Sequence, residues 1–222
     1  MTTAVKICGI TDTTGLDAAL AGGADYVGLV FFPKSPRNLA HAAARALRDR
    51  VPRTSATKTV ALVVDPTDTD LAAIIRDVDP DLIQLHGHES LERVAGIRAR
   101  FNKPILKAIP VASAADVEAG LAYLAPGRLA DILLFDAKPD PAAVLPGGNG
   151  LAFDWHILDG IKDRTDFALA GGLTPDNVAE AIARTGAAIV DVSSGVERTP
   201  GRKDPGLIRR FLQAAKGAKQ GA

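Results

Sequence analysis

The sequence predicts a single (β/α)8 barrel, the α/β architecture known as the TIM barrel, from three observations. Eight short apolar segments alternate with longer amphipathic segments along the 222 residues. The apolar segments are rich in Val, Ile and Leu and mostly lack polar alternation, which is typical of parallel strands covered on both faces. No change of composition marks a second domain, so we expect one domain over 1–222, with about 214–222 frayed.

The eight predicted strands follow one another through the whole chain. They are 5–10, 25–31, 59–64, 82–87, 104–110, 131–137, 167–171 and 188–194. Eight strand–helix units in a chain of this length favour a closed barrel over an open sheet. The alternative is a flavodoxin-like or Rossmann fold, but the first strand lacks the G-x-G-x-x-G pattern that dinucleotide binding requires.

The predicted helices lie between these strands and carry signals at their ends. In 174–186, Thr174 is the expected N-cap, Pro175 takes the first helical position and Gly186 ends the helix. Similar stretches occur at 11–23, 65–78, 88–101 and 204–217.

The charge balance excludes partners that are recognised by bulk charge. The chain has 26 basic and 26 acidic residues, so nothing indicates nucleic acid or an anionic membrane. There is one cysteine, no signal peptide pattern and no apolar run of membrane-spanning length, so we expect a cytoplasmic protein. A monomer is the default expectation and a homodimer is the alternative.

The polar side chains gather where the predicted strands end, which is where (β/α)8 enzymes build their active sites. Each one alone is more simply a hydrogen-bonded structural group, but their coincidence at several strand ends favours a site. These residues are Cys8, Gln84, His86, Asp136, Asp191, Ser193 and Ser194, with Gly171, Gly172 and Gly195 following strands seven and eight.

Strand parity places several of these side chains on one face. Lys6 and Cys8 are two residues apart, as are Gln84 and His86, and alternate residues of a strand share a face. Lys6 either lowers the pKa of the Cys8 thiol or forms an ion pair with Asp191 on the adjacent strand, and the sequence leaves both interpretations open. The four histidines show no zinc-binding spacing, so we expect no metal and no redox cofactor.

A phosphate site is expected beside these groups. Strands seven and eight lie between strands six and one around the ring, and they end in Gly-Gly-Leu and Ser-Ser-Gly. Loops of this kind present backbone N–H groups to an anion. We therefore assign Gly171, Gly172, Ser193, Ser194 and Gly195 to phosphate binding.

Six segments in order resemble the phosphoribosylanthranilate isomerase family of tryptophan biosynthesis. They are VKICGIT, GLVFFPKSPRNL, LIQLHGHE, PGGNGLAFDW, FALAGGLTPDNV and VDVSSGVERTPGRKD. The resemblance extends from Val5 to about Phe211. It implies an Amadori rearrangement of N-(5′-phosphoribosyl)anthranilate, the small-molecule partner, to 1-(2-carboxyphenylamino)-1-deoxyribulose 5-phosphate.

The resemblance also implies roles for individual residues. The Cys of KICG maps onto Cys8 as the general base, and the Asp that ends strand six maps onto Asp136 as the general acid. The Arg of Ser-Pro-Arg maps onto Arg37, which binds the anthranilate carboxylate. Gln84, His86 and Asp191 are assigned to substrate binding.

Two alternatives share this kind of barrel. One is the aminoaldose isomerase of histidine biosynthesis, which uses two aspartates and binds two phosphates, whereas this chain has Cys8 and one phosphate site. The other is a non-catalytic phosphosugar-binding barrel, which would not need both Cys8 and Asp136. The Pro- and Gly-rich segment 138–153 is predicted to be a mobile lid, and Leu151 stands where the family often has a lysine.

Overall fold

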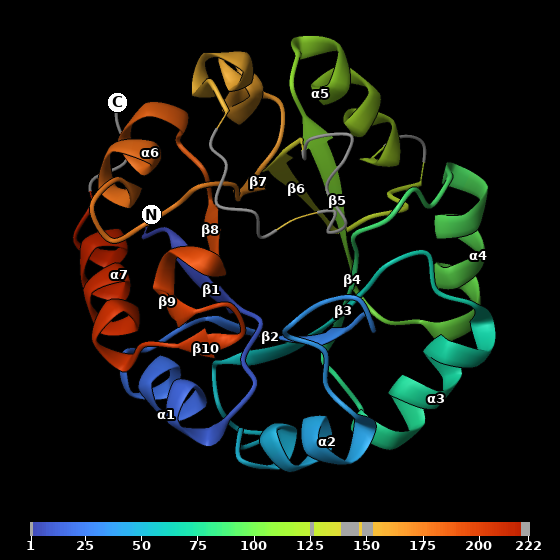
Figure 1. Ribbon diagram of the computed structural model, residues 1–222. Coiled ribbons are helices and arrows are strands. Elements are labelled where there is room, and N and C mark those ends of the chain that lie inside the picture. The colour runs from blue at the N-terminus through green and yellow to red at the C-terminus, as the bar shows by residue number, and fades with distance from the viewer. Residues whose placement is uncertain (1, 125–126, 139–146, 148–152, 219–222) are drawn as a thin grey trace.

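Eight parallel strands close into one barrel in chain order, with β8 hydrogen-bonded to β1 (Figure 1). They are β1 (Ala4–Cys8), β2 (Tyr26–Phe31), β3 (Lys58–Val63), β4 (Leu82–Leu85), β5 (Ile105–Val111), β6 (Ile132–Ala137), β7 (Phe167–Leu169) and β8 (Ile189–Val192). The computed structural model describes residues 2–124, 127–138, 147 and 153–218. All eight strands begin and end within two residues of their predicted bounds, and the predicted barrel fold is confirmed.

Helices form a ring outside the barrel (Figure 1). They are α1 (Thr13–Ala21), α2 (His41–Asp49), α3 (Asp68–Val78), α4 (Leu91–Phe101), α5 (Ala114–Leu121), α6 (Val178–Thr185) and α7 (Pro205–Gly217). Side-chain caps explain several starts: Thr67 forms a capping box before α3, and Asp204 accepts two backbone N–H groups before α7. These caps fix where each strand-to-helix loop ends.

The helix α6 begins later than the sequence predicts. Its N-cap is Asn177, so the predicted start at Thr174 and Pro175 is wrong, whereas Gly186 ends the helix with φ +65° as expected. The Thr174 hydroxyl accepts from Asp176 N, and Asn177 Nδ2 donates to Gly172 O, so a closed turn precedes the helix. This turn fixes the loop that follows β7.

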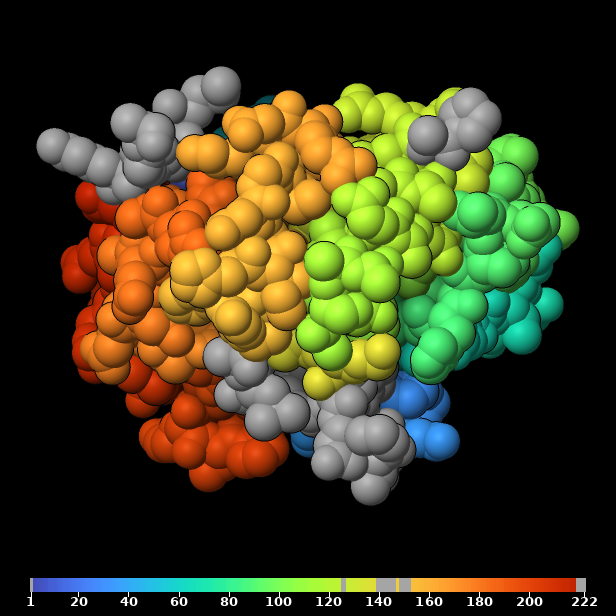
Figure 2. All heavy atoms as spheres, turned by 90° about the horizontal axis from the view of Figure 1, so that it is seen from above, coloured from blue at the N-terminus to red at the C-terminus, as the bar shows by residue number. Residues whose placement is uncertain are grey.

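Between β6 and β7 the described residues contain two 3-10 turns, η2 (Trp155–Leu158) and η3 (Ile161–Asp163), in place of the expected α-helix. Figure 2 shows this side of the molecule, with the gold atoms of these turns between the green atoms around α5 and the orange atoms of α6. The buried side chains of Leu158 and Ile161 belong to the main core, so the short turns still cover the barrel.

The barrel interior contains two small apolar clusters, apart from the main core between strands and helices. One cluster is formed by Leu106, Ala108, Leu134, Ala168, Ala170 and Ile189, and it fills part of the barrel. The other is formed by Cys8, Val30 and Leu62. Cys8 is therefore packed against apolar side chains at the barrel mouth.

A two-stranded hairpin, β9 (Glu197–Thr199) and β10 (Arg202–Lys203), separates β8 from α7. The helix α7 continues to Gly217, and fraying of the last residues stays a prediction because 219–222 lie outside the described residues. Within the described part of the chain, no helix is long and apolar enough to span a membrane.

Candidate active site

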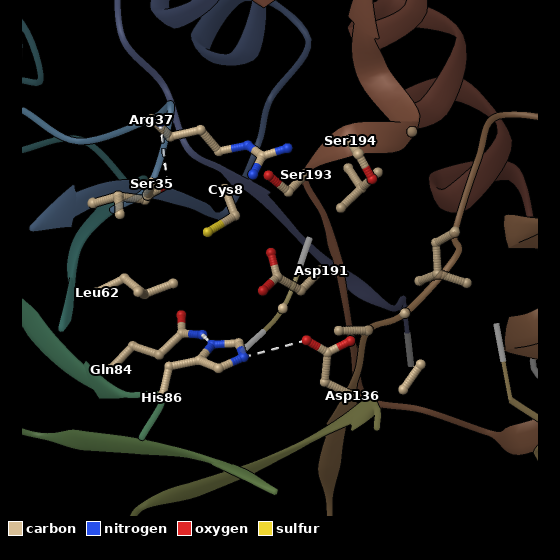
Figure 3. Close-up of a pocket in the computed structure, with 18 of the residues that line it drawn as sticks. Cys8, Ser35, Arg37, Leu62, Gln84, His86, Asp136, Asp191, Ser193 and Ser194 are labelled. Carbon is tan, nitrogen blue, oxygen red and sulfur yellow. Dashed lines mark hydrogen bonds and ion pairs between the residues drawn. The ribbon is translucent and has the colours of Figure 1, made fainter. Parts of the chain in front are cut away.

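A pocket with an empty volume of about 790 Å³ opens at the carboxyl ends of the strands. All eleven residues predicted to form the site line it: Cys8, Arg37, Gln84, His86, Asp136, Gly171, Gly172, Asp191, Ser193, Ser194 and Gly195. In Figure 3, Cys8, Asp191 and Asp136 surround the same space. The structure therefore brings the predicted residues together in one pocket at the carboxyl ends of the strands.

Cys8 ends β1 above a buried ion pair. The Lys6 Nζ lies 2.8 Å from Asp191 Oδ2, with side-chain exposures of 0% and 6%. The register of β1 with β8 places these two residues opposite each other. Of the two interpretations of Lys6, the ion pair with Asp191 is confirmed. Asp191 Oδ1 is buried and has no hydrogen-bond partner among the described residues.

The Cys8 thiol is held in its protonated form. Burial raises its pKa above the ordinary value of 9.0, and the opposing charge of Lys6 does not overcome that effect. The downward shift expected from the sequence is therefore wrong. Burial alone would lower the pKa of Lys6, but Asp191 and Cys8 outweigh it and raise the pKa instead. The positive charge of Lys6 is thus largely matched by Asp191.

Gly28 on β2 provides the space that Cys8 occupies. A Cβ at this position would lie 2.9 Å from Cys8 Sγ and 3.3 Å from Lys6 Nζ. Any side chain there would displace the thiol from the ammonium below it.

Asp136 is linked through His86 to Gln84 on β4, two strands away in the barrel. Its Oδ2 lies 3.3 Å from His86 Nε2, and His86 Nδ1 lies 2.9 Å from Gln84 Nε2 (Figure 3). An amide N–H donated to Nδ1 leaves the ring proton on Nε2, where it points to Asp136. His86 is therefore placed to donate to the carboxyl group. Gln84 Oε1 is buried without a partner among the described residues.

Gly147 approaches this pair from the segment predicted to be a lid. A Cβ on it would lie 2.6 Å from both Asp136 Oδ2 and His86 Nε2. Residues 139–146 and 148–152, including Leu151, lie outside the described residues, so the lid stays a prediction.

The turns after β7 and β8 contain glycines at positions where another side chain would be strained or would clash. Gly171 and Gly172 have φ values of +86° and +64°, which favour glycine. A Cβ on Gly195 would lie 1.9 Å from Leu173 O, so the two turns pack directly against each other. Together they form one side of the pocket.

Arg37 reaches the pocket from the β2–α2 loop and is held from behind by Glu197. Its Nε and Nη2 donate to the two Glu197 oxygens, each at 2.8 Å. Lys203 Nζ also contacts Glu197 Oε1 at 2.8 Å, and donates to Ser193 O at 3.0 Å. Sequence reasoning missed Glu197 and Lys203, because nothing local links the hairpin to a loop 160 residues earlier.

The sequence analysis also missed the apolar wall of the pocket, formed by Val30, Phe32, Leu62 and Val64. Strand parity could have found Val30, which shares a strand face with Gly28. Among the residues that the structure describes, no group of three or more His, Cys, Asp or Glu side chains is arranged to hold a metal ion.

Comparisons with known proteins agree with this geometry. The family model described as N-(5′-phosphoribosyl)anthranilate (PRA) isomerase matches residues 5–214. The isomerase of that name from Paramagnetospirillum magneticum is 54% identical over 215 residues, which are 97% of this chain and 98% of the relative.

Two solved structures resemble the chain closely. One contains monomers generated from the dimeric phosphoribosylanthranilate isomerase of Thermotoga maritima, with a TM-score of 0.82, 34% identity and coverage of 97% and 99%. The other is a phosphoribosylanthranilate isomerase in complex with reduced 1-(o-carboxyphenylamino)-1-deoxyribulose 5-phosphate, with a TM-score of 0.82, 33% identity and the same coverage.

Proposed function

Because this chain belongs to the N-(5′-phosphoribosyl)anthranilate isomerase family of tryptophan biosynthesis, we propose the reaction and the residues that perform it. The chain converts N-(5′-phosphoribosyl)anthranilate to 1-(2-carboxyphenylamino)-1-deoxyribulose 5-phosphate. Cys8 is the general base and Asp136 is the general acid.

The observation that carries this proposal is the placement of a thiol and a carboxyl group in one pocket whose side is made of glycine-rich turns. Cys8 and Asp136 both line the pocket together with Gly171 and Ser194. An aldose–ketose rearrangement needs an acid and a base near adjacent carbons, and the turns would hold the phosphate at a fixed distance from both.

Ring opening is the first step that the site must assist. Asp136 donates a proton to the ring oxygen as the C1–O bond breaks, and the nitrogen lone pair forms a protonated imine. His86 Nε2, 3.3 Å from Asp136 Oδ2, then faces the carboxylate that this step leaves and stabilises it by hydrogen bonding.

Proton removal from C2 is the second step. The Cys8 thiolate takes this proton, which gives an enol-amine that tautomerises to the aminoketone. Burial opposes the thiolate in the free enzyme, but the positive charge of the imine favours it when substrate is bound.

Two buried acceptors support sugar binding at this position. Asp191 Oδ1 and Gln84 Oε1 both lack partners among the described residues, and both residues line the pocket. Buried acceptors are rarely left unpaired, so ribose hydroxyl groups are suitable donors to them. Arg37 would bind the anthranilate carboxylate through its planar fork.

The experiment follows the loss of fluorescence of freshly prepared phosphoribosylanthranilate. Wild type consumes it, whereas Cys8→Ser and Asp136→Asn lose about 10²- to 10⁴-fold in kcat and keep the wild-type circular dichroism spectrum. Normal turnover by either variant removes that residue from its role.

Two controls separate the alternatives. The bisphosphorylated aminoaldose of histidine biosynthesis is not turned over, and turnover of it would favour that isomerase. Binding of phosphoribosylanthranilate by wild type without turnover would favour a phosphosugar-binding barrel. Because a relative is described as dimeric, sedimentation at several concentrations tests the expected monomer against a homodimer.

A further inference from the structure

A buried ion network lies behind the pocket and contains two residues outside its lining. Arg37, Glu197 and Lys203 have side-chain exposures of only 7%, 4% and 1%. Glu197 lies between the two cations, with 2.8 Å contacts to both. Charged side chains are buried this completely only when they are paired, so their arrangement is strongly constrained.

Glu197 determines which edge of the Arg37 guanidinium faces the pocket. It accepts from Nε and from Nη2, so a carboxylate in the pocket would meet the Nη1–Nη2 edge. The aliphatic part of Arg37 is fixed as well, because a Cβ on Gly9 would lie 2.5 Å from Arg37 Cδ. The planar fork is therefore held at both ends of the side chain.

Lys203 connects this network to the turn after β8. Its ammonium donates to Ser193 O at 3.0 Å and to Ser193 Oγ at 3.3 Å, while it also contacts Glu197. Ser193 belongs to the turn that would bind phosphate. The arginine and this turn therefore share one rigid support, the hairpin β9–β10 with its Glu197–Lys203 pair.

We propose that Glu197 is a positioning residue for substrate specificity. It orients Arg37 so that the guanidinium recognises a carboxylate on the aromatic ring, while Lys203 fixes the phosphate-binding turn beside it. The inference rests on the proposed role of Arg37, and the experiment below distinguishes failure of one from failure of the other.

The test compares two inhibitors by isothermal titration calorimetry. One is the reduced product analogue, which carries the ring carboxylate, and the other is its counterpart made from aniline, which lacks it. In wild type the carboxylate improves binding about 10- to 100-fold, as for a charge-assisted hydrogen-bonded pair. In Glu197→Gln this ratio falls to about threefold or less, close to the ratio in Arg37→Ala.

Lys203→Met is the matched control. It keeps the Arg37–Glu197 pair, so the ratio stays within about threefold of wild type while both inhibitors bind more weakly by the same factor. A purely structural role of the network would weaken both inhibitors equally in every variant. Glu197→Asp keeps all charges but has a side chain too short to hold Arg37 in the same way. If Glu197→Gln does not fold, an intermediate ratio between the two inhibitors in Glu197→Asp supports the positioning role.

The outcomes separate the two claims. If Arg37→Ala loses the preference for the carboxylate but the Glu197 variant that folds retains it, the positioning role is wrong. If Arg37→Ala itself retains the preference, the proposed role of Arg37 is wrong and the recognition of the carboxylate lies elsewhere.

Discussion

The two sides of the pocket hold their reactive groups by different physical means. On the side of β1 and β8, Cys8 lies over a fully buried ion pair, Lys6–Asp191. On the side of β4 and β6, Asp136 lies 3.3 Å from His86 Nε2, and His86 is in turn held by a hydrogen bond from Gln84. In the first arrangement, the group beneath the base also stabilises the barrel. In the second, we expect that changing the partner of the acid lowers the free energy of unfolding only slightly.

The largest effect that tests this comparison is expected from Lys6→Met. The variant leaves Asp191 buried with no cation beside it, which destabilises the fold by about 3–5 kcal/mol. The measurement is the free energy of unfolding in urea. The matched control, Arg45→Met, breaks an exposed pair with Asp49 and leaves that free energy close to the wild-type value. A loss below 1 kcal/mol for Lys6→Met would show that the ion pair does not support the barrel.

The next largest effect is expected on the acid side, from His86→Ala. The variant removes the donor to Asp136, so kcat falls about 10- to 100-fold. The free energy of unfolding changes by less than about 1 kcal/mol, because His86 lines the pocket and water there can replace the imidazole beside Asp136. His88→Ala, whose side chain is 91% exposed, serves as the control with unchanged kcat. Equal losses of stability for His86→Ala and Lys6→Met would contradict the difference between the two sides.

The ionisation of Cys8 sharpens the comparison on the base side. Its pKa lies above the ordinary value of 9.0 because of burial, so below that value the thiolate fraction grows about tenfold for each pH unit. Since the chain has one cysteine, the rate of alkylation by iodoacetamide reports this site alone. We expect that rate to rise without a plateau between pH 6 and 9. A plateau near pH 7 would mean that Lys6 stabilises the thiolate more than burial opposes it.

The sequence was informative where a residue's position follows from regular geometry. Strand parity and the rule that barrel sites lie at carboxyl strand ends pointed to ten of the eleven predicted pocket residues, and the family resemblance supplied Arg37. The start of α6 was misplaced because Asn177 closes a turn that Pro175 alone does not reveal. Glu197 was missed because its contact with Arg37 depends on how a hairpin folds back over the barrel.

The Cys8 pKa shows a different limit of sequence reasoning. Parity correctly placed Lys6 on the same face as Cys8, but the direction of the pKa shift depends on how completely the thiol is buried and on how far Asp191 matches the Lys6 charge. The spacing of residues in the sequence predicts neither the burial of the thiol nor the matching of the Lys6 charge. The sequence was enough to identify Lys6 and Cys8 as neighbours. The direction of the Cys8 pKa shift could be determined only from the packing around them.

The smallest effect comes from a pair of glycine substitutions, one in an outer helix and one beside Cys8. Gly96 lies in α4 with open space where a Cβ would stand, so Gly96→Ala raises the free energy of unfolding by about 0.5–1 kcal/mol. The same substitution at Gly28 meets Cys8 Sγ at 2.9 Å and Cys8 Cα at 3.1 Å, so Gly28→Ala is destabilising and lowers kcat. Urea unfolding and the fluorescence assay on both variants check this contrast. A Gly28→Ala variant with wild-type stability and kcat would show that Cys8 does not depend on the space beside it, because the thiol could then shift without consequence for the reaction.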